Sequence, residues 1–495
     1  MELSVQSQSY HFLRNIVQEV RFQEETAEMI VPDSCPDIGT IVDAYAGAIL
    51  RGKDCRDGSV SVSGGVKGGI LYLSEDGTPH VLEFYLPFNT KIDHPELTSH
   101  SNVLCDVRIQ SVDGRIINSR KAMLRVNLGF YVDGYEQETE TCSHPEAVPD
   151  WMQVLKKTYP LHLPLAYDEK SFSLHDVADT PDLSKLYKLI CRPEVTEQKI
   201  LGNKAVFKGT VQYKAAYLTQ EGQLRIHTNT IPFSQYCQME QEFDEDKLSV
   251  IPIVTGFDWT TEGEGTGKKG EITVHILVQC VVSGTRELSV IEDAYSLNGT
   301  LEGEWKEFQF QPCLDRQKTS VAMRPLTMEA LKTVLDTEFY PGFPELKRES
   351  DQVCCEVPIQ VRVIGRKDEG ILAGVDGIGI AEFRNPICVD ATCMAWISSI
   401  CSGYGLSAAD TTEVRGEVLL DWKCIGGQPI KSLCSCKNIP SEAERPAAVL
   451  RYLPEDSLLW DLAKSSCAKA SDIQAFNHLE GEFVPAGRLL LVPVG

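Results

Sequence analysis

The sequence has few basic residues for its size. Its 495 residues include 47 Lys and Arg against 71 Asp and Glu, which gives a formal net charge of −24 and a pI of about 4.9. Nucleic acids and anionic membranes are bound through basic patches, so this balance argues against both as direct partners. An acidic chain is instead suited to a protein surface that is basic or of mixed charge.

A long apolar run and a secretion signal are also missing. No segment is long and apolar enough for a transmembrane helix, and the N-terminus, Met1–Gln6, has neither a basic start nor an apolar stretch. We therefore expect a soluble protein without a transmembrane segment, in a reducing compartment. There the 17 cysteines stay free, and their odd number leaves at least one unable to pair within the chain.

Signatures of catalysis and metal binding are absent as well. There is no His-Glu-x-x-His and no Gly-x-Ser-x-Gly motif, and the glycine-rich run Gly263–Lys269 does not fit the phosphate-loop pattern. The cysteines cluster late, but no Cys-x2-Cys pair occurs and no histidine lies between His275 and His478. That spacing offers no zinc site. We expect a protein that is not an enzyme and has no metal and no cofactor.

Most of the late cysteines are expected to be buried and free, because unpaired Cys is commonly a small core residue. Cys434 and Cys436 lie near a predicted linker and are expected to be the exposed exception. They are the cysteines best placed to form cross-links under oxidising conditions.

The body of the chain contains an internal repeat at an offset of 145 residues. Pro36-Asp37-Ile38 corresponds to Pro181-Asp182-Leu183, and Leu86-Pro87-Phe88 corresponds to Ile231-Pro232-Phe233. Between these motifs, Gly, Val, Tyr, Leu and Gly recur in register without a gap: Gly64, Val66, Tyr72, Leu73, Gly77 and Gly209, Val211, Tyr217, Leu218, Gly222. So many shared glycines, prolines and aromatics indicate a duplication.

Each copy begins with a segment of helical spacing and continues with strands. Asp37 and Asp182 are candidate caps for short helices over Ile38–Val42 and Leu183–Tyr187. In the second copy, alternating residues predict strands over 205–218 and 223–233. A weaker third unit is expected between Cys354 and Cys436, with strands over 357–364, 371–383, 392–400 and 413–424.

We therefore predict a mainly β protein of tandem antiparallel β-domains, followed by a small α/β domain of βααβ order. The predicted ranges are 1–143, 175–300 and 301–437 for the β-domains, 144–174 and 438–447 for the linkers, and 448–495 for the last domain.

The C-terminal segment reads as strand, helix, helix and strand. Leu459, Leu462 and Ala463 share one face of the first helix, which Asp456 or Ser457 can cap. A second helix follows, with Asp472 as its cap, Ile473 and Phe476 on its inner side, and a turn at Gly487 before the closing strand. Leu458 and Leu459 exceed what one helix face needs, so either both are core or one is exposed as a contact.

This segment resembles a LysM domain, on the basis of Asp456-Ser457-Leu458-Leu459-Trp460, Asp472–Asn477 and Pro485-Ala486-Gly487. The resemblance implies a binding groove formed by Glu455, Asp456, Ser457, Leu458, Leu479, Glu480 and Gly481. LysM domains usually carry Gly-Asp-Ser/Thr-Leu-Trp before the first helix. Here Glu455 replaces the glycine, and an extra leucine separates Ser457 from Trp460.

The repeated β unit resembles the SPOCS domain of clostridial spore proteins, on the basis of the Pro-Asp, Gly-x-Val-x5-Tyr and Pro-Phe motifs listed above. Tandem SPOCS units followed by LysM resemble the SipL-like family of spore-coat morphogenetic proteins. This implies a non-enzymatic scaffold in the mother-cell cytoplasm and then at the forespore surface and spore coat. Its LysM would dock a SpoIVA-type coat ATPase or another spore-coat protein. The alternative is a LysM that binds peptidoglycan or N-acetylglucosamine glycans.

Overall fold

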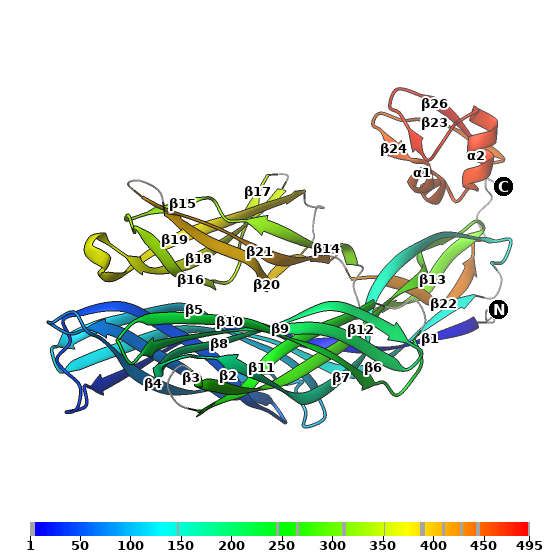
Figure 1. Cartoon of the computed structure of the whole chain (residues 1–495). Helices are drawn as coiled ribbons and strands as arrows, with labels where there is room; N and C mark the ends of the chain where they lie inside the picture. Colours follow the sequence, from blue (N-terminus) through cyan, green and yellow to red (C-terminus); the bar gives the residue numbers. More distant parts are fainter. Residues whose placement is uncertain are drawn as a thin grey trace.

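A computed structural model describes residues 5–145, 148–243, 247–263, 267–308, 313–350, 352–386, 392–407, 411–425, 429–441 and 446–493. The described chain is mainly β, with antiparallel sheets and two short α-helices (Figure 1), which confirms the predicted fold class at this level. It comprises three β units, a two-stranded ribbon and a small C-terminal unit.

The first unit is a sandwich of two sheets, ordered β2-β3-β4 and β1-β6-β5. Its strands are β1 Val5–Ile30, β2 Thr40–Arg56, β3 Ser59–Leu73, β4 Pro79–Asp93, β5 Asn102–Asn118 and β6 Lys121–Pro145. Alternate residues point inward, so Val62 and Phe84 of one sheet share an apolar core with Leu124 and Val126 of the other.

The second unit repeats this arrangement, with sheets ordered β8-β9-β10 and β11-β12-β7. Its strands are β7 Met152–Asp179, β8 Leu183–Leu201, β9 Lys204–Thr219, β10 Leu224–Gln238, β11 Lys247–Glu262 and β12 Lys269–Ser296. Phe207 and Val211 of the first sheet pack in one core with Val274 and Ile276 of the second.

In the third unit β18 is the central strand of one sheet and β21 that of the other. β16 and β17 both pair with β18 on one side, and β19 pairs with it on the other. The strands are β14 Cys313–Ala322, β15 Leu326–Met328, β16 Thr333–Pro341, β17 Glu345–Glu349, β18 Gln352–Arg366, β19 Leu372–Pro386, β20 Thr392–Ser407 and β21 Thr412–Ile425.

The recurring glycines and phenylalanines of the repeat face each other across neighbouring strands. Gly64 lies opposite Phe88, and Gly209 lies opposite Phe233. A Cβ on Gly64 would lie 2.4 Å from the Phe88 ring and 2.2 Å from the carbonyl oxygen of Ile49. The ring covers the glycine, so this position excludes any side chain. The shared motif is therefore a packing requirement of both sandwiches.

The predicted helices over Ile38–Val42 and Leu183–Tyr187 are wrong, because these residues belong to or lead into β2 and β8. Each strand carries a β-bulge here, between Ile41 and Asp43 in β2 and between Leu186 and Lys188 in β8. A bulge adds one residue to the strand and breaks its alternation. Apolar residues then recur at a spacing of three or four, which imitates a helix.

The domain limits also differ from the prediction, most clearly before the second unit. Residues 152–174, expected in a linker, form most of β7, which pairs with β12 along its whole length. The prolines that suggested a break, Pro160 and Pro164, lie in this strand at the edge of its sheet, where a missing N–H can face away from the ladder.

The C-terminal unit has the predicted order of strand, helix, helix and strand. Its elements are β23 Ala448–Tyr452, β24 Ser457–Leu458, α1 Leu459–Ser466, α2 Ala470–Asn477, β25 Phe483–Val484 and β26 Leu489–Pro493. Leu459, Leu462, Ala463 and Ile473 are buried as predicted, whereas Phe476 is exposed, so its predicted inner position is wrong. The turn at Gly487 has a positive φ of 82°.

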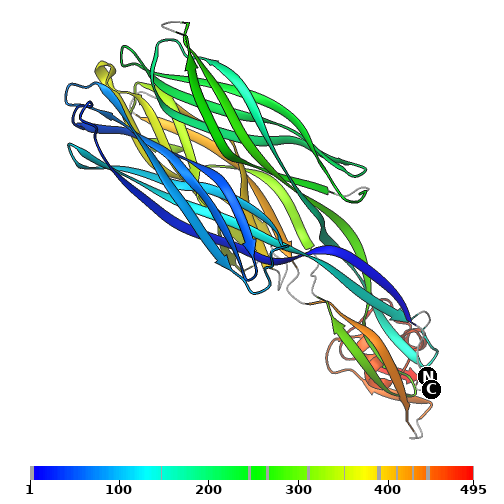
Figure 2. The same ribbon diagram turned by 90° about the horizontal axis from the view of Figure 1, so that it is seen from below.

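The three β units lie side by side with their long strands aligned, which gives an elongated body (Figures 1 and 2). A ribbon of β13 Gly299–Glu307 and β22 Lys431–Pro440 continues one end of this body. The C-terminal unit lies beside this ribbon, at the same end of the molecule as the N-terminus (Figures 1 and 2).

Candidate functional site

The C-terminal unit brings two loops together through a short strand pair. Ser457 pairs with Val484 and Leu458 pairs with Phe483. The backbone N–H of Leu459 also donates to the carbonyl oxygen of Glu482, at 2.8 Å. Residues 455–458 and 480–483 therefore lie beside each other.

Leu458 and Phe483 form an exposed apolar ridge on these loops. Leu458 is 50% exposed and Phe483 is 55% exposed, whereas Leu459 is buried. Of the two alternatives for the leucine pair, the structure therefore shows one core residue and one exposed residue. Phe483 was missed by the sequence analysis, although the alternation of Phe483 and buried Val484 is the signal of a half-buried strand.

The other predicted groove residues have different surroundings. Leu479 is buried in the core of the C-terminal unit, so its side chain is not exposed on the two loops. Glu455, Glu480 and Gly481 are exposed on the two loops, as is Glu482. Three carboxylates thus border the apolar ridge, which suits a ligand that combines apolar groups with positive charge.

Asp456 and Ser457 hold the first loop and do not cap α1. The Asp456 carboxylate accepts a hydrogen bond from the backbone N–H of Ala486 at 2.7 Å, and the Ser457 hydroxyl donates to the carbonyl oxygen of Glu455 at 3.3 Å. Leu458 is the residue at the N-cap of α1, and Asp472 lies within the first turn of α2. The predicted caps are therefore wrong, because the oxygens of Asp456 and Ser457 bind loop atoms and Asp472 lies inside α2, where it accepts from the Ser471 hydroxyl.

The C-terminal unit is attached to the end of β12 through α1. The carboxylate of Asp293 accepts hydrogen bonds from Trp460 Nε1 at 2.8 Å and from Lys464 Nζ at 2.7 Å. Burial raises the pKa of Asp293, but the hydrogen bonds from Lys464 and Trp460 outweigh it and leave the pKa below its usual value. The Tyr295 hydroxyl also donates to the carbonyl oxygen of Ala468 at 2.7 Å, so the contact is polar and specific.

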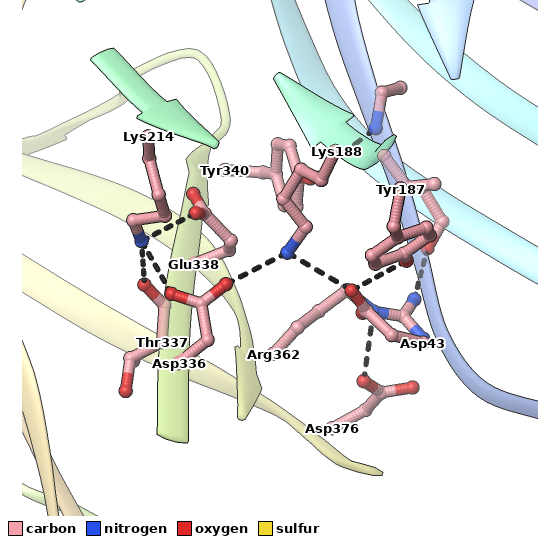
Figure 3. A network of polar contacts seen from close by, with 12 residues as sticks. Asp43, Tyr187, Lys188, Lys214, Asp336, Thr337, Glu338, Tyr340, Arg362 and Asp376 are labelled. Atoms are coloured by element: carbon pink, nitrogen blue, oxygen red, sulfur yellow. Dashed lines mark hydrogen bonds and ion pairs between the residues drawn. The ribbon is translucent and has the colours of Figure 1, made fainter. Parts of the chain in front are cut away.

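A second arrangement of charged groups lies where the three β units meet (Figure 3). The ammonium group of Lys188, from the second unit, lies 3.0 Å from Asp43 of the first unit and 2.9 Å from Asp336 of the third. All three side chains are buried. One lysine of the second unit therefore joins carboxylates of the other two.

These three residues occupy the same position in their sheets. Lys188 stands 145 residues after Asp43, and Asp336 stands 148 residues after Lys188. Each follows a β-bulge in the first strand, and each faces the middle strand at the corresponding place, opposite Leu71, Ala216 and Ile364. The turn after each middle strand contains a glycine with positive φ: Gly77, Gly222 and Gly370. Each glycine stands at the same distance along the chain from the junction residue of its own unit.

Two more cations complete the junction from the middle strands. Lys214 Nζ of β9 lies 2.6 Å from Asp336 and 2.6 Å from Glu338. Arg362 Nε of β18 lies 3.1 Å from Asp43. Thus the second unit supplies a cation to the third, and the third supplies one to the first (Figure 3).

The junction keeps its charges. Burial raises the pKa of Asp43 and of Asp336, yet the facing cations outweigh this and hold both pKa values below the usual range. Burial lowers the pKa of Lys188, and the carboxylates around it outweigh that effect and raise its pKa well above the usual value. Fixed, mutually neutralised charges suit a structural joint between units.

The cysteines pair closely in two places and hold no metal site in the described ranges. Cys393 lies opposite Cys424 with the sulfur atoms 3.2 Å apart, and the Cys237 and Cys280 sulfurs are 3.5 Å apart. No group of three metal-binding side chains occurs among the described residues. Cys434 and Cys436 are half-buried, contrary to the predicted exposure, because β22 packs against the body near Met152.

No helix among the described residues is long and apolar enough to span a membrane. The glycine-rich run Gly263–Lys269 joins β11 to β12, which pair with each other, and Lys269 is the first residue of β12. Residues 264–266 of the run are outside the described part.

Comparison with known proteins relates two segments of the chain to one family. Residues 37–117 and 182–260 match the family model described as "SipL, SPOCS domain". No curated protein and no solved structure matches the chain. The matched segments run from β2 to β5 in the first unit and from β8 to β11 in the second. They are therefore similar to SipL SPOCS domains, which indicates a SipL-like protein related to sporulation and the spore coat.

Proposed function

We propose that this protein is a non-enzymatic scaffold for spore-coat assembly that presents a docking module at one end of a stiff body. The observation that carries the proposal is the exposed Leu458–Phe483 ridge with its acidic border, on a unit fixed to the body through Asp293. The buried junction around Lys188 supports the stiffness of the body, because separating the units would expose unpaired charges.

The third β unit is in this proposal a divergent third SPOCS domain. Its support is the shared order of strands, the bulge before Asp336 and the turn glycine at Gly370. The C-terminal unit is in this proposal a LysM domain, supported by its βααβ order and by the position of the ridge between the loops.

The partner we propose is a SpoIVA-type coat ATPase, or another spore-coat protein, with a segment that is both apolar and basic. Leu458 and Phe483 would contact its apolar side chains, and Glu455, Glu480 and Glu482 would attract its charges. The place of action would be the mother-cell cytoplasm and then the forespore surface and coat.

A glycan is the second candidate, favoured by the exposed ring of Phe483, because aromatic faces pack against apolar faces of other molecules. The carboxylates favour the protein partner, since N-acetylglucosamine is uncharged.

Pull-downs with the full chain distinguish the two. Baits would be purified SpoIVA-type ATPase and purified spore peptidoglycan, with the double variant Leu458→Ala/Phe483→Ala and the control Phe476→Ala, an exposed aromatic of the same unit. We expect the double variant to lose the ATPase and the control to keep it. Retention of peptidoglycan alone by the unchanged chain would favour the glycan binder, and an equal loss in the control would place the contact elsewhere.

A further inference from the structure

The outer face of the β23–β26 sheet is apolar and points away from the body. Leu450 and Tyr452 on β23 are 65% and 61% exposed, and Leu489 and Leu491 on β26 are 62% and 37% exposed. They are neighbours on one face, because Leu450 pairs with Leu491 and Tyr452 with Leu489. The helix α1 carries the contact with the body, and the sheet lies on the far side of the unit (Figure 1).

The two edges of this sheet differ. On β26, the side chain of Asn477 donates to the carbonyl oxygen of Leu491 at 2.7 Å and accepts from its N–H at 2.8 Å. This amide closes the edge as a neighbouring strand would. No comparable group covers β23 in the described part of the chain, where its one strand partner is β26.

The bonds of Asn477 also fix the direction of the backbone groups on β23. Leu491 directs its N–H and C=O toward Asn477, so the opposite pair, Leu450 and Leu491, is the kind that exchanges no hydrogen bonds. Leu450 therefore directs its own N–H and C=O to the open edge, and Ala448 and Tyr452 do the same because the direction alternates. An edge of this kind is a template for another strand.

We infer that β23 pairs with β23 of a second copy of this chain, antiparallel and around a two-fold axis at Leu450. In that register each Leu450 faces its counterpart and exchanges two backbone hydrogen bonds with it. Each Tyr452 lies opposite the small Ala448 of the second copy, which leaves room for the ring to cover the neighbouring leucine. On the inner face Val449 meets Arg451, so no like charges are opposed.

The pairing is an interface on the C-terminal unit and is separate from the Leu458–Phe483 ridge. A contact between two five-residue strands is small compared with standard stable interfaces. It therefore forms at high local concentration, as when many copies collect on one surface, and it links two elongated bodies through their C-terminal units.

Sedimentation of the full chain over a range of concentrations tests this. We expect a concentration-dependent dimer. Leu450→Pro removes an N–H that points to the open edge and takes part in no internal bond, so the unit folds but its dimer dissociation constant rises at least about tenfold. Leu450→Lys has the same effect by opposing two like charges at the axis.

The control is Leu489→Lys, which adds the same charge to the same face on the strand away from the axis. It is expected to leave the dimer largely intact. A chain that stays monomeric at all concentrations overturns the inference. So does equal weakening by Leu489→Lys and Leu450→Lys, which would show face-to-face docking, and so does a monomeric chain whose binding to a coat protein is lost in Leu450→Pro.

Discussion

Replacing Lys188 by Met tests whether the buried junction holds the three β units together. Methionine has a similar length and no charge, so Asp43 and Asp336 would each lose a cation at 3.0 and 2.9 Å. Breaking a buried ion pair by removing one partner typically costs 3–5 kcal/mol. Because Arg362 still faces Asp43 and Lys214 still faces Asp336, we expect the lower end, about 3 kcal/mol.

The matched control is Lys208→Met in the same unit, which removes an exposed ion pair of 3.1 Å with Glu197. Exposed pairs contribute at most about 1 kcal/mol. The assay is urea unfolding of the full chain, followed by circular dichroism, with the free energy of the first transition compared between variants. Equal effects of Lys188→Met and Lys208→Met would refute the reasoning.

The same perturbation has a pH signature. The folded pKa values of Asp43 and Asp336 are depressed, so these groups contribute stability above their unfolded pKa values, and it is lost as pH falls through the folded ones. Without Lys188 the depression is smaller. The cost of Lys188→Met is therefore expected to stay constant down to the unfolded pKa values of the two carboxyl groups and to shrink as pH falls below them. Adding Asp336→Asn to Lys188→Met should restore part of the stability at pH 7.

Three further predictions follow from the packing of the repeat and of the C-terminal unit. Gly209→Ala places a Cβ 2.1 Å from the carbonyl oxygen of Glu194. We expect the free energy of unfolding of the full chain in urea to fall by about 1–3 kcal/mol, as for overpacking. Unchanged stability would contradict the argument that Gly209 must be glycine to pack against Phe233. Leu462→Ala should cost about 2–5 kcal/mol and unfold the C-terminal unit first, seen as protease cleavage there, while the exposed Phe476→Ala stays resistant. Asp293→Asn removes the ion pair with Lys464 and should speed hydrogen exchange in α1; the unchanged chain should show the same loosening only as pH falls through the depressed pKa of Asp293.

The duplication and the antiparallel strands could be predicted from the sequence, because they depend on contacts between neighbouring strands. The glycines and phenylalanines of the 145-residue repeat recur because a ring must cover each glycine, and this requirement is visible in sequence. The predicted helices failed because a bulge changes the spacing of apolar residues without changing the residue types. In the third unit β16 and β17 were missed because they divide what is a single long strand, β8, in the second unit.

The two sites differ in how far the sequence reveals them. The loops around Leu458 follow from the order of elements, but the exposure of Phe483 depends on its pairing across β24 and β25. The sequence contains one sign of the junction. Asp43 and Lys188 have opposite charges and stand at equivalent positions of the repeat, beside apolar residues. The third member of the junction, Asp336, lies in a copy too divergent to align, so only the fold brings the three together.

The most direct test of the scaffold proposal is a titration of the full chain with purified SpoIVA-type ATPase and, separately, with an N-acetylglucosamine oligomer at several salt concentrations. Attraction between the carboxylates of the C-terminal unit and a basic partner weakens as salt screens it. The proposal predicts binding of the ATPase that weakens with salt and no binding of the oligomer. Binding of the oligomer that is indifferent to salt, with no binding of the ATPase, would contradict it.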